Sequence, residues 1–314
     1  MKISIGARIK DGPWGGGNLF VINLSKYLEK KGHQVVYDLK DNDIDLILLT
    51  DPRKRSESST FTHKEIKKYL KKINSNTKVV HRINECDERK NTKGLNNFYI
   101  KVNKISDYTI FVSSWLKTLY IDAGYKSENN RVIMSGSDSK IFFPKSVYTP
   151  HEKIRFVTHH WGANWNKGFD TYKKLDDLLS SEDWNKKIEF TYIGNLPKKF
   201  NFKNTRYIEP LSGVDLATEL RKHNAYVTGS LNEPSGNHHI EGAQCGLPLL
   251  YMQSGALPEY CKGYGVSYDI NNFEEKIKIF LNEYDFYKKE VLNYPRNSDK
   301  MCQDYLDVFL KLLI

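Results

Sequence analysis

The sequence lacks the features of disulfide-rich, zinc-binding, membrane-spanning and repeat proteins. It has four cysteines in 314 residues, and none is part of a C-x-x-C motif or of a paired spacing. This argues against a disulfide framework or a zinc site, and we expect reduced thiols in a cytoplasmic protein. No apolar run is long enough to span a bilayer, and residues 1–8 do not resemble a signal peptide. There is no internal repeat and no low-complexity tract, so we expect a globular protein.

Acidic residues are scarce in the first half of the chain. Residues 1–150 carry 27 Lys and Arg against 16 Asp and Glu, whereas residues 151–314 carry 21 against 22. The formal net charge of +10 therefore comes entirely from the first half. A nucleic acid, an anionic membrane surface or an anionic substrate could each account for such an excess.

Strand-like and helix-like segments alternate along the whole chain, which predicts mainly parallel sheets covered by helices on both faces. The alternation pauses at residues 139–152, where two prolines bracket polar residues. We therefore expect two α/β domains, residues 1–146 and 147–314, with a cleft between them. Residues 273–314 are expected to be helical and to belong to the second domain.

A lysine-rich segment at residues 63–73 is amphipathic. Its apolar residues Ile66, Tyr69, Leu70 and Ile73 share one helical face, and lysines cover the other. Two interpretations follow: a surface helix packed on its own domain, or a helix that lies on anionic lipid headgroups.

The glycine loop at residues 12–17 lies between a predicted strand and a predicted helix, where backbone groups can approach a phosphate. Asp38 follows at about the distance of a ribose-binding acid in a nicotinamide site. However, the loop lacks the G-x-G-x-x-G spacing, and Phe20 occupies the position of the third glycine. The pattern therefore disfavours dinucleotide binding.

Two groups of residues resemble metal sites, and we expect neither to bind a metal. The alternating aspartates at 41, 43 and 45 precede a strand, so they lie at the wrong edge of a parallel sheet for a D-x-D site. His238 and His239 are adjacent, and adjacent helical side chains point about 100° apart. His238 and Glu241 could share one ion, but two ligands do not make a zinc site.

The segment from Asn232 to Pro248 reads as the start of a phosphate-binding helix. It follows a strand at residues 225–229, and Ser235 is expected to cap a helix over residues 236–245. The free N–H groups at the helix start would bind an anion at the carboxyl end of the strand. Glu233 and Glu241 would flank that anion and accept hydrogen bonds from sugar and ribose hydroxyls.

This segment, E-P-S-G-N-H-H-I-E-G-A-Q-C-G-L-P (233–248), and S-G-A-L-P-E (254–259) resemble the donor-site signature of retaining GT-B glycosyltransferases of the GT4 family (glycosyltransferase group 1). Residues 15–35, V-S-S-W-L-K (112–117), residues 135–144 and N-K-G-F-D (166–170) resemble further elements of that family. The resemblance covers essentially the whole chain. It implies the GT-B fold, in which two Rossmann-like α/β domains face a central cleft.

The resemblance also implies roles for residues of the second domain. Glu233 is expected to face the hydroxyls of the donor sugar, and Glu241 to hold the ribose. Lys167 is expected to neutralise the leaving diphosphate. The helix start beneath that diphosphate would be formed by Gly236, Asn237 and His238.

In the first domain the resemblance implies that Gly16 and Gly17 close on the diphosphate, and that His81 lies at a strand end beside the sugar. The sequence departs from the family at residues 159–168, which lack the arginine that usually precedes the lysine. Candidates to replace it are His160, Trp161, Asn164 and Arg82.

The function expected from this resemblance is retaining, metal-independent transfer of a sugar from a nucleotide diphosphate sugar, with UDP favoured, to a hydroxyl of a glycan or lipid-linked acceptor. The nucleotide sugar is a substrate, and no cofactor is expected. The basic first domain suggests an anionic acceptor and a cytoplasmic protein peripheral to the inner face of the cell membrane. Alternatives are a nucleotide-sugar epimerase, or a basic membrane- or nucleic-acid-binding protein with an inactive cleft. Nucleic acid is disfavoured because the lysine-rich face lacks interleaved aromatics.

Overall fold

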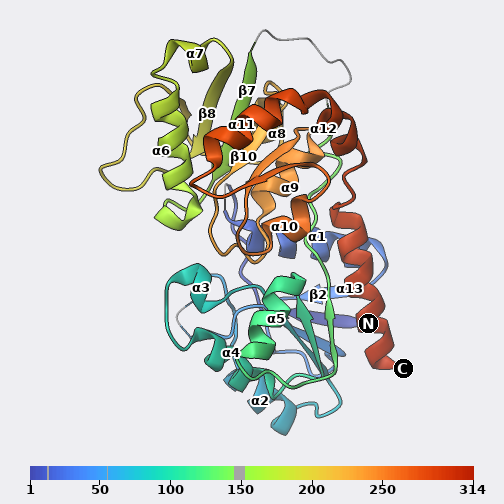
Figure 1. Ribbon diagram of the computed structural model, residues 1–314. Coiled ribbons are helices and arrows are strands. Elements are labelled where there is room, and N and C mark those ends of the chain that lie inside the picture. The colour runs from blue at the N-terminus through green and yellow to red at the C-terminus, as the bar shows by residue number, and fades with distance from the viewer. Residues whose placement is uncertain (13, 55, 145–152) are drawn as a thin grey trace. The chain divides into compact units, whose positions relative to one another are not determined.

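The computed structural model describes residues 1–12, 14–54, 56–144 and 153–314 (Figure 1). The chain divides into two compact units. Unit 1 comprises Met1–Gly136 and Ser298–Ile314, and unit 2 comprises Ser137–Asn297. By sequence, unit 1 carries 27 Lys and Arg against 18 Asp and Glu, so the positive charge is concentrated there.

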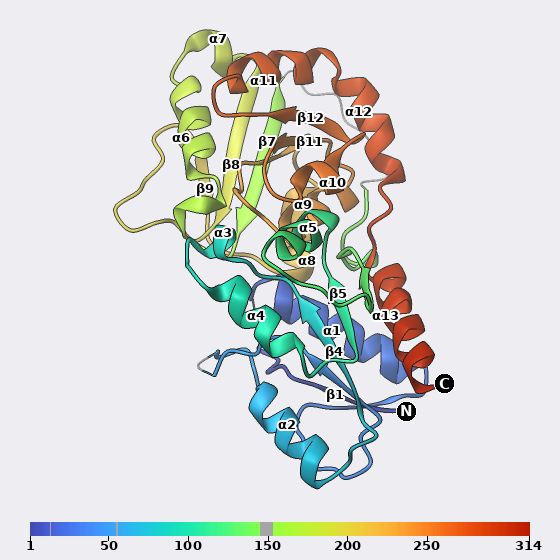
Figure 2. The same ribbon diagram turned by 60° about the horizontal axis from the view of Figure 1, so that its bottom comes forward.

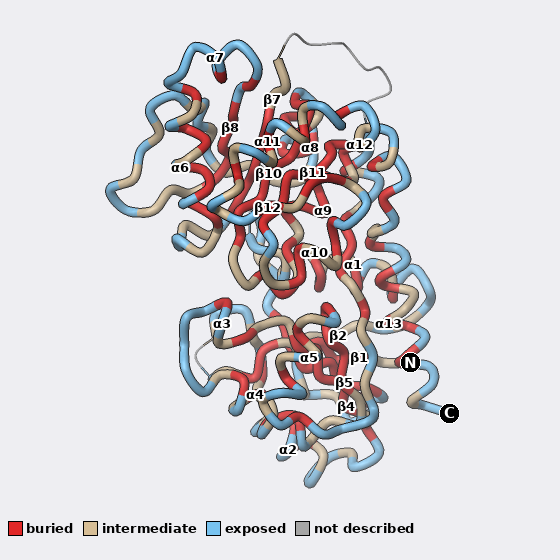
Figure 3. The backbone as a smooth tube through the Cα atoms, viewed as in Figure 1, coloured by how far each residue is buried: buried red, intermediate tan, exposed pale blue. Residues whose placement is uncertain are grey.

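Unit 1 is built on a parallel six-stranded sheet with the order β2-β1-β3-β4-β5-β6. Its inner strands are mostly buried (Figure 3), and β3 is entirely apolar, as expected for a parallel strand covered on both faces. The strands are β1 (Lys2–Ile5), β2 (Gln34–Val36), β3 (Leu46–Leu49), β4 (Lys78–Ile83), β5 (Tyr108–Phe111) and β6 (Asn130–Val132).

Helices cover both faces of this sheet. On one face, α1 (Gly16–Lys30) and α13 (Ser298–Leu313) share a core cluster with Leu48 and Val80. On the other face, α2 (His63–Lys72) packs against Val79, and α4 (Leu95–Asn103) packs nearby. The remaining helices are α3 (Asp87–Lys90) and α5 (Ser114–Asp122). Because side chains alternate along a strand, odd and even residues of β4 face different helices.

The place of α13 differs from the expectation that residues 147–314 form one domain. Residues 298–314 belong to unit 1, where Phe309 and Tyr305 are buried in the core cluster that contains α1. Arg131 Nη2 of unit 1 also lies 3.1 Å from Asp304 Oδ1 of α13. The amphipathic helix therefore buries its apolar face on unit 1 instead of continuing unit 2. The expected boundary at 146/147 lies outside the described residues.

Unit 2 repeats the architecture with a second parallel sheet, ordered β12-β11-β10-β7-β8-β9. In Figure 2, α6 (Phe169–Leu178) runs beside β8 (Ile188–Gly194), and Tyr172 of α6 contacts the Phe190 and Tyr192 rings of that strand. The strands are β7 (Ile154–His160), β8 (Ile188–Gly194), β9 (Arg206–Ile208), β10 (Ala225–Thr228), β11 (Leu249–Met252) and β12 (Gly265–Tyr268).

The helical elements of unit 2 connect these strands and close the unit. They are η1 (Trp165–Lys167), α6 (Phe169–Leu178), α7 (Glu182–Asn185), α8 (Gly213–Leu220), α9 (Asn237–Gln244), α10 (Leu257–Cys261), α11 (Phe273–Asn282), α12 (Tyr284–Glu290) and η2 (Val291–Asn293). The prediction of two α/β halves with parallel sheets is confirmed. Among the described residues, no helix is long and apolar enough to cross a membrane.

The lysine-rich segment forms α2, which begins with a capping box between Thr62 and Glu65. Ile66 and Tyr69 are buried in the core of unit 1, and Leu70 is partly buried against it. Most of the apolar face of this helix is therefore occupied by its own unit, although Ile73 at its end is half exposed, and this favours the packed interpretation over the lipid-bound one.

The alternating aspartates lie around the amino end of β1. Lys2 Nζ lies 2.9 Å from Asp41 Oδ2 and 2.6 Å from Asp43 Oδ1. Asp45 accepts a hydrogen bond from the Lys2 backbone N–H at 2.6 Å. These carboxylates bind a lysine of their own sheet at its amino edge.

Candidate functional site

The loop after β10 and the helix α9 form the centre of the candidate site in unit 2. Helix α9 begins at Asn237, and its N-cap is Gly236, so the prediction that Ser235 caps it is wrong. Ser235 Oγ instead accepts a hydrogen bond from the Tyr260 hydroxyl at 3.1 Å. A Cβ atom at Gly236 would lie 2.4 Å from the His238 ring. Glycine therefore leaves the helix start without a side chain over its N–H groups.

Helix α9 lies very close to its strand. A Cβ atom at Gly242 would lie 2.3 Å from the ring of Tyr226 on β10. The absence of a side chain at Gly242 lets the helix and the strand pack at this distance. As a result, the first turn of α9 is held at the carboxyl edge of the sheet, beside the loop that carries Glu233.

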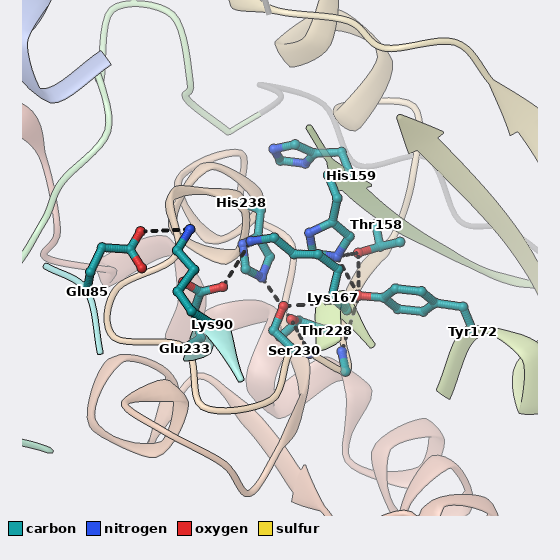
Figure 4. A network of polar contacts seen from close by, with 12 residues as sticks. Glu85, Lys90, Thr158, His159, Lys167, Tyr172, Thr228, Ser230, Glu233 and His238 are labelled. Carbon is teal, nitrogen blue, oxygen red and sulfur yellow. Dashed lines mark hydrogen bonds and ion pairs between the residues drawn. The ribbon is translucent and has the colours of Figure 1, made fainter. Parts of the chain in front are cut away.

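Lys167 and Glu233 lie together, as the prediction that both serve the donor requires. Lys167 Nζ donates to Glu233 Oε2 at 3.1 Å, and the two side chains are 19% and 8% exposed (Figure 4). Lys167 comes from η1 after β7, whereas Glu233 follows β10. Two residues 66 positions apart in sequence thus form a mostly buried ion pair.

A close backbone contact brings Lys167 to this place. Gly168 has a φ of +106°, and a Cβ atom there would lie 2.5 Å from the carbonyl carbon of Gly229 at the end of β10. The Leu231 N–H also donates to the Asn166 carbonyl at 2.8 Å. Gly168 is therefore required for this close packing. The packing in turn directs Lys167 toward the loop after β10.

The S-G-A segment at 254–256 supports the Glu233 loop from the other side. Gly255 has a φ of +61°, and a Cβ atom there would lie 2.4 Å from the Glu233 nitrogen. The Ala256 N–H donates to the Glu233 carbonyl at 2.9 Å, and the Asn232 N–H donates to Ser254 Oγ at 2.9 Å. The sequence showed this segment as part of a signature, and the structure shows that it positions the Glu233 backbone.

Glu241 has a partner that the sequence analysis missed. Its Oε2 lies 2.8 Å from His159 Nε2, and both side chains are mostly buried. The other ring nitrogen, His159 Nδ1, lies 3.1 Å from the Tyr226 hydroxyl. His159 stands at the carboxyl end of β7, and the only sequence signal was its place at a strand end beside the strand that precedes α9. The ribose-binding role of Glu241 stays a prediction.

The adjacent histidines are both buried and point to different partners. His238 Nε2 lies 2.8 Å from Thr228 Oγ1, and burial holds its pKa well below the usual value, with help from His160. His239 packs its ring against Tyr260, and burial lowers its pKa to about 3. Both imidazoles are therefore neutral at pH 7. No group of three or more His, Cys, Asp or Glu residues suited to a metal occurs among the described residues.

A layer of buried hydroxyl groups lies beneath the site, and the sequence analysis did not foresee it. The Tyr268 hydroxyl donates to the Thr228 carbonyl at 3.0 Å, and the Gly229 N–H donates to the Tyr172 hydroxyl at 3.2 Å. His160 Nε2 lies 2.6 Å from the same Tyr172 hydroxyl, so this candidate replacement for the missing arginine is engaged inside the unit. These bonds tie the ends of β7, β10 and β12 together.

In unit 1, Gly16 and Gly17 form the first turn of α1. The N-cap is Gly15, which makes no side-chain cap hydrogen bond, and the first turn contains no acidic residue. Gly17 is exposed, and a Cβ atom there would have no neighbour within 4 Å. The helix start is thus open, as a phosphate-binding turn requires.

The expected position of His81 is corrected by the structure. Strand β4 continues to Ile83, so His81 lies within it and not at its end. Its side chain is 0% exposed, its Nδ1 lies 2.9 Å from Asn103 Oδ1, and burial lowers its pKa to about 4. The neutral imidazole is enclosed between the sheet and α4, and the role of His81 beside the sugar stays a prediction.

Comparisons with known proteins identify the fold. No protein-family model matches the chain, and no curated protein matches it in sequence. Solved structures, in contrast, match the chain in fold. Sucrose-phosphate synthase from Thermosynechococcus elongatus superposes with a TM-score of 0.71 at 14% identity, covering 99% of both chains.

Two further structures are similar over nearly the whole chain. HepE from Anabaena in complex with UDP and glucose has a TM-score of 0.69 at 12% identity, covering 99% of this chain and 100% of that one. An α-glucosyltransferase in complex with UDP and a DNA 13-mer has a TM-score of 0.67 at 16% identity, covering 99% of both chains. At these identities the likeness concerns the fold, and the two parallel six-stranded sheets with their helices constitute the GT-B fold.

Proposed function

We propose that this protein is a retaining, metal-independent glycosyltransferase of the GT4 type that uses a nucleotide diphosphate sugar, with a UDP-sugar favoured. The observation that carries the proposal is the Lys167–Glu233 pair, 3.1 Å apart beside the glycine-capped start of α9. The arrangement of a cation, a helix start and a carboxylate at one point of the sheet edge supports this proposal.

These groups suit the departure of a diphosphate. Negative charge grows on the leaving phosphate oxygens as the bond from the sugar breaks. The ammonium of Lys167 and the N-terminus of α9 would stabilise that charge without transferring a proton. They also supply the positive charge that a metal ion would otherwise bring, which is why we propose metal independence. When Lys167 turns to the diphosphate, the Glu233 carboxylate loses its ion-pair partner and accepts hydrogen bonds from the sugar hydroxyls.

We propose a hydroxyl of a glycan or lipid-linked molecule as the acceptor, bound mainly by unit 1 with its excess of positive charge. We also propose that this charge draws the protein to the anionic inner face of the membrane from the cytoplasm. The α-glucosyltransferase complex with DNA has the same fold, so the fold does not decide between a glycan, a lipid and a nucleic acid.

A transfer assay tests the proposal. Thermal-shift screening against nucleotide sugars identifies the donor, because a ligand at a hundred times its dissociation constant stabilises by about 2.7 kcal/mol. Release of the nucleotide diphosphate is then measured for wild type, Glu233→Gln and Lys167→Met. Both variants should lose activity by at least about a hundredfold. Lys173→Met is the matched control, since it removes an exposed lysine that pairs with Asp177 in the same unit.

Three outcomes would count against the proposal. Activity that survives both substitutions would show that the pair is not part of the machinery. An epimerised nucleotide sugar in place of transfer would favour the epimerase alternative. Inversion at the anomeric carbon, read by NMR of the product, or loss of activity in EDTA, would refute the retaining or the metal-independent part.

A further inference from the structure

Unit 2 contains a cavity of about 320 Å³ that is not part of the candidate site. It lies where three strands of the sheet begin, because Arg155 of β7, Ile188 of β8 and Arg206 of β9 all line it. His223 also lines it, two residues before the start of β10. Helix α7, which precedes β8 in the chain, lies near this end of the strand (Figure 2).

The cavity and the candidate site lie at opposite edges of this sheet. The strands run parallel, so their amino ends share one edge and their carboxyl ends share the other. Lys167 and Glu233 follow the carboxyl ends of β7 and β10. Strand β7 has seven residues, and a rise of about 3.3 Å per residue separates the two edges by roughly 20 Å. A small ligand in the cavity therefore does not reach the Lys167–Glu233 pair.

Cations outnumber acids around the cavity. Among the described residues that line it, Arg155, Arg206 and Lys222 are cationic, and Glu189 is the one carboxylate. Arg206 Nη1 and Lys222 Nζ lie 3.2 Å and 2.6 Å from the two oxygens of Glu219, so two cations share one buried acid. The side chains of Arg206 and Lys222 are 61% and 57% exposed, which leaves them accessible to a ligand.

The walls of the cavity are held by buried polar side chains. Asn224 is 3% exposed, and its Oδ1 accepts hydrogen bonds from the backbone N–H of Arg155 at 3.0 Å and from Nε of the same residue at 3.3 Å. Asp176 is 4% exposed and accepts hydrogen bonds from the backbone N–H groups of Asn204 and Thr205, each at 2.8 Å. These bonds fix one guanidinium and the segment that leads into β9, so the cavity is preorganised for a ligand.

The uncharged polar groups of the cavity suit hydroxyls. His223 Nδ1 lies 2.9 Å from the Glu219 carbonyl, which only accepts, so this nitrogen carries the proton. Burial lowers the pKa of His223 to about 4, so the ring is neutral at pH 7 and its Nε2 is an acceptor. Asn185, Thr191 and Asn204 also line the cavity, and their side chains both donate and accept.

The size and the apolar lining of the cavity indicate a small ligand. A volume of about 320 Å³ is at the lower end of the roughly 300–1,000 Å³ that small-molecule sites occupy. Leu179, Ile188 and Phe190 add buried apolar surface, which suits the C–H groups of a sugar. The cavity thus combines positive charge, hydroxyl-binding groups and apolar surface in the space of about one sugar unit.

We infer that this cavity is a second ligand site of the protein and binds a small phosphorylated polyol, such as a sugar monophosphate. The guanidinium groups of Arg155 and Arg206 would donate paired hydrogen bonds to the phosphate oxygens, and Lys222 would add a third positive charge. The neutral side chains would bind the hydroxyls. The site does not depend on the proposed function, because it lies at the other edge of the sheet and is tested by binding instead of transfer.

The test measures binding to the full-length protein by calorimetry. Wild type is titrated with glucose 6-phosphate and ribose 5-phosphate as probes, and with inorganic phosphate and glucose for comparison. At least one of the two sugar phosphates should bind more tightly than inorganic phosphate. Glucose, which has no charge, should bind at least about tenfold more weakly than that probe. Failure of both sugar phosphates to bind would overturn the inference.

Two variants remove one guanidinium each. In Arg155→Met, Asn224 keeps its hydrogen bond to the backbone of residue 155, and in Arg206→Met the acid Glu219 keeps Lys222. Each variant should weaken binding of the sugar phosphate by about tenfold or more, because charge-assisted hydrogen bonds are lost.

Lys173→Met is the matched control for these variants. It removes a lysine of unit 2 that is 59% exposed, pairs with Asp177 and does not line the cavity. Its affinity for the sugar phosphate should stay within about threefold of wild type. An equal loss in Lys173→Met would show that the effect comes from net charge, which would overturn the inference.

A second pair of variants fills the cavity without removing a cation. Asn185 lines the cavity and is exposed, so it accepts a larger side chain. Asn185→Trp should weaken binding by about tenfold or more, whereas Asn185→Ala should stay within about threefold of wild type. Thermal unfolding shows which variants are folded, and the Asn185 pair decides if an arginine variant is not. Unchanged binding in Asn185→Trp would place the probe elsewhere and overturn the inference.

A final comparison separates this cavity from the donor site, which a sugar phosphate can also enter. Lys167→Met should bind the sugar phosphate, and Arg206→Met should bind UDP, each within about threefold of wild type. Loss of the sugar phosphate in Lys167→Met, with no loss in Arg206→Met, would assign the phosphate to the donor site and overturn the inference. If no nucleotide sugar binds while the sugar phosphate still depends on Arg206, the second site stands and the proposed function fails.

Discussion

At the scale of single residues, His239 is a fully buried imidazole. Both ring nitrogens lack a partner among the described residues, and burial lowers the pKa to about 3. The folded state therefore keeps this ring neutral, while the unfolded chain protonates it below about pH 6.5. The free energy of unfolding is therefore unaffected by His239 above about pH 6.5. It decreases as the pH falls from there toward 3, because the unfolded chain then binds a proton that the folded state does not.

We predict that His239→Phe matches wild type in stability at pH 7.5 and exceeds it under acid conditions. Phenylalanine fills the space beside Tyr260 and removes two unsatisfied nitrogens. Between about pH 6.5 and pH 4 the variant should gain roughly 1.4 kcal/mol per pH unit relative to wild type. Urea denaturation at a series of pH values checks this, and parallel stability curves would contradict it.

The His159–Glu241 pair allows a second prediction at this scale. The two atoms lie 2.8 Å apart and are mostly buried, so removing one partner leaves the other unsatisfied. His159→Leu and Glu241→Leu should each lower the free energy of unfolding by about 1–3 kcal/mol. The double variant should lose less than the sum of the two, because neither member of the pair is left without the other. Denaturant unfolding of all four proteins measures this coupling, and simple additivity would show that the pair is not coupled.

At the scale of elements, the loop around Glu233 depends on Gly255. We predict that Gly255→Ala weakens donor binding by about tenfold or more, although it removes no charged or hydrogen-bonding side chain. The added Cβ atom would lie 2.4 Å from the Glu233 nitrogen and must displace that loop.

Gly263→Ala is the matched control for this prediction. Gly263 has a φ of +91°, so alanine is strained there too, but a Cβ atom would meet nothing within 4 Å. Calorimetry with the nucleotide sugar found in the screen compares the two variants. Equal affinity in both would mean that the loop tolerates displacement and that Gly255 does not position Glu233.

The elements themselves were largely predictable from sequence, because hydrophobic periodicity and glycine stops are local signals. The strand at 225–228 and the helix after it follow from β-branched residues, a turn and Gly246, which comes just after the helix and has a φ of +76°. The cap at Gly236 was missed because Ser235 is a better cap in isolation, and its hydroxyl is bound to Tyr260 instead. His159, Tyr172 and the support from Gly255 were missed because their partners lie far away in sequence.

For His81, the predicted end of the strand was wrong. A resemblance placed it at a strand end, but the pairing of Arg82 with Ile110 and of Ile83 with Phe111 extends the strand past it. Strand length depends on neighbouring strands, which a single segment does not reveal. The same pairing turns Arg82 toward α1, which the sequence alone could not show.

At the scale of the whole molecule, α13 completes unit 1. We predict that a chain ending at residue 297 loses the cooperative unfolding of unit 1 and binds a hydrophobic dye, because the face of α1 and the sheet that packs on Phe309 becomes exposed. Unit 2 should keep its own transition, since all of its strands and helices remain. Calorimetric scanning of both chains measures this. A shortened chain with both transitions intact would contradict the prediction.

The division into units also has a consequence for synthesis. Unit 2 is one continuous stretch of chain, whereas unit 1 consists of two pieces separated by 161 residues. As the polypeptide leaves the ribosome, unit 2 can fold as soon as it has emerged. Unit 1 has to wait for α13, which is translated after unit 2, and part of its apolar surface stays uncovered until then. The half that is translated first is thus the half that finishes folding second.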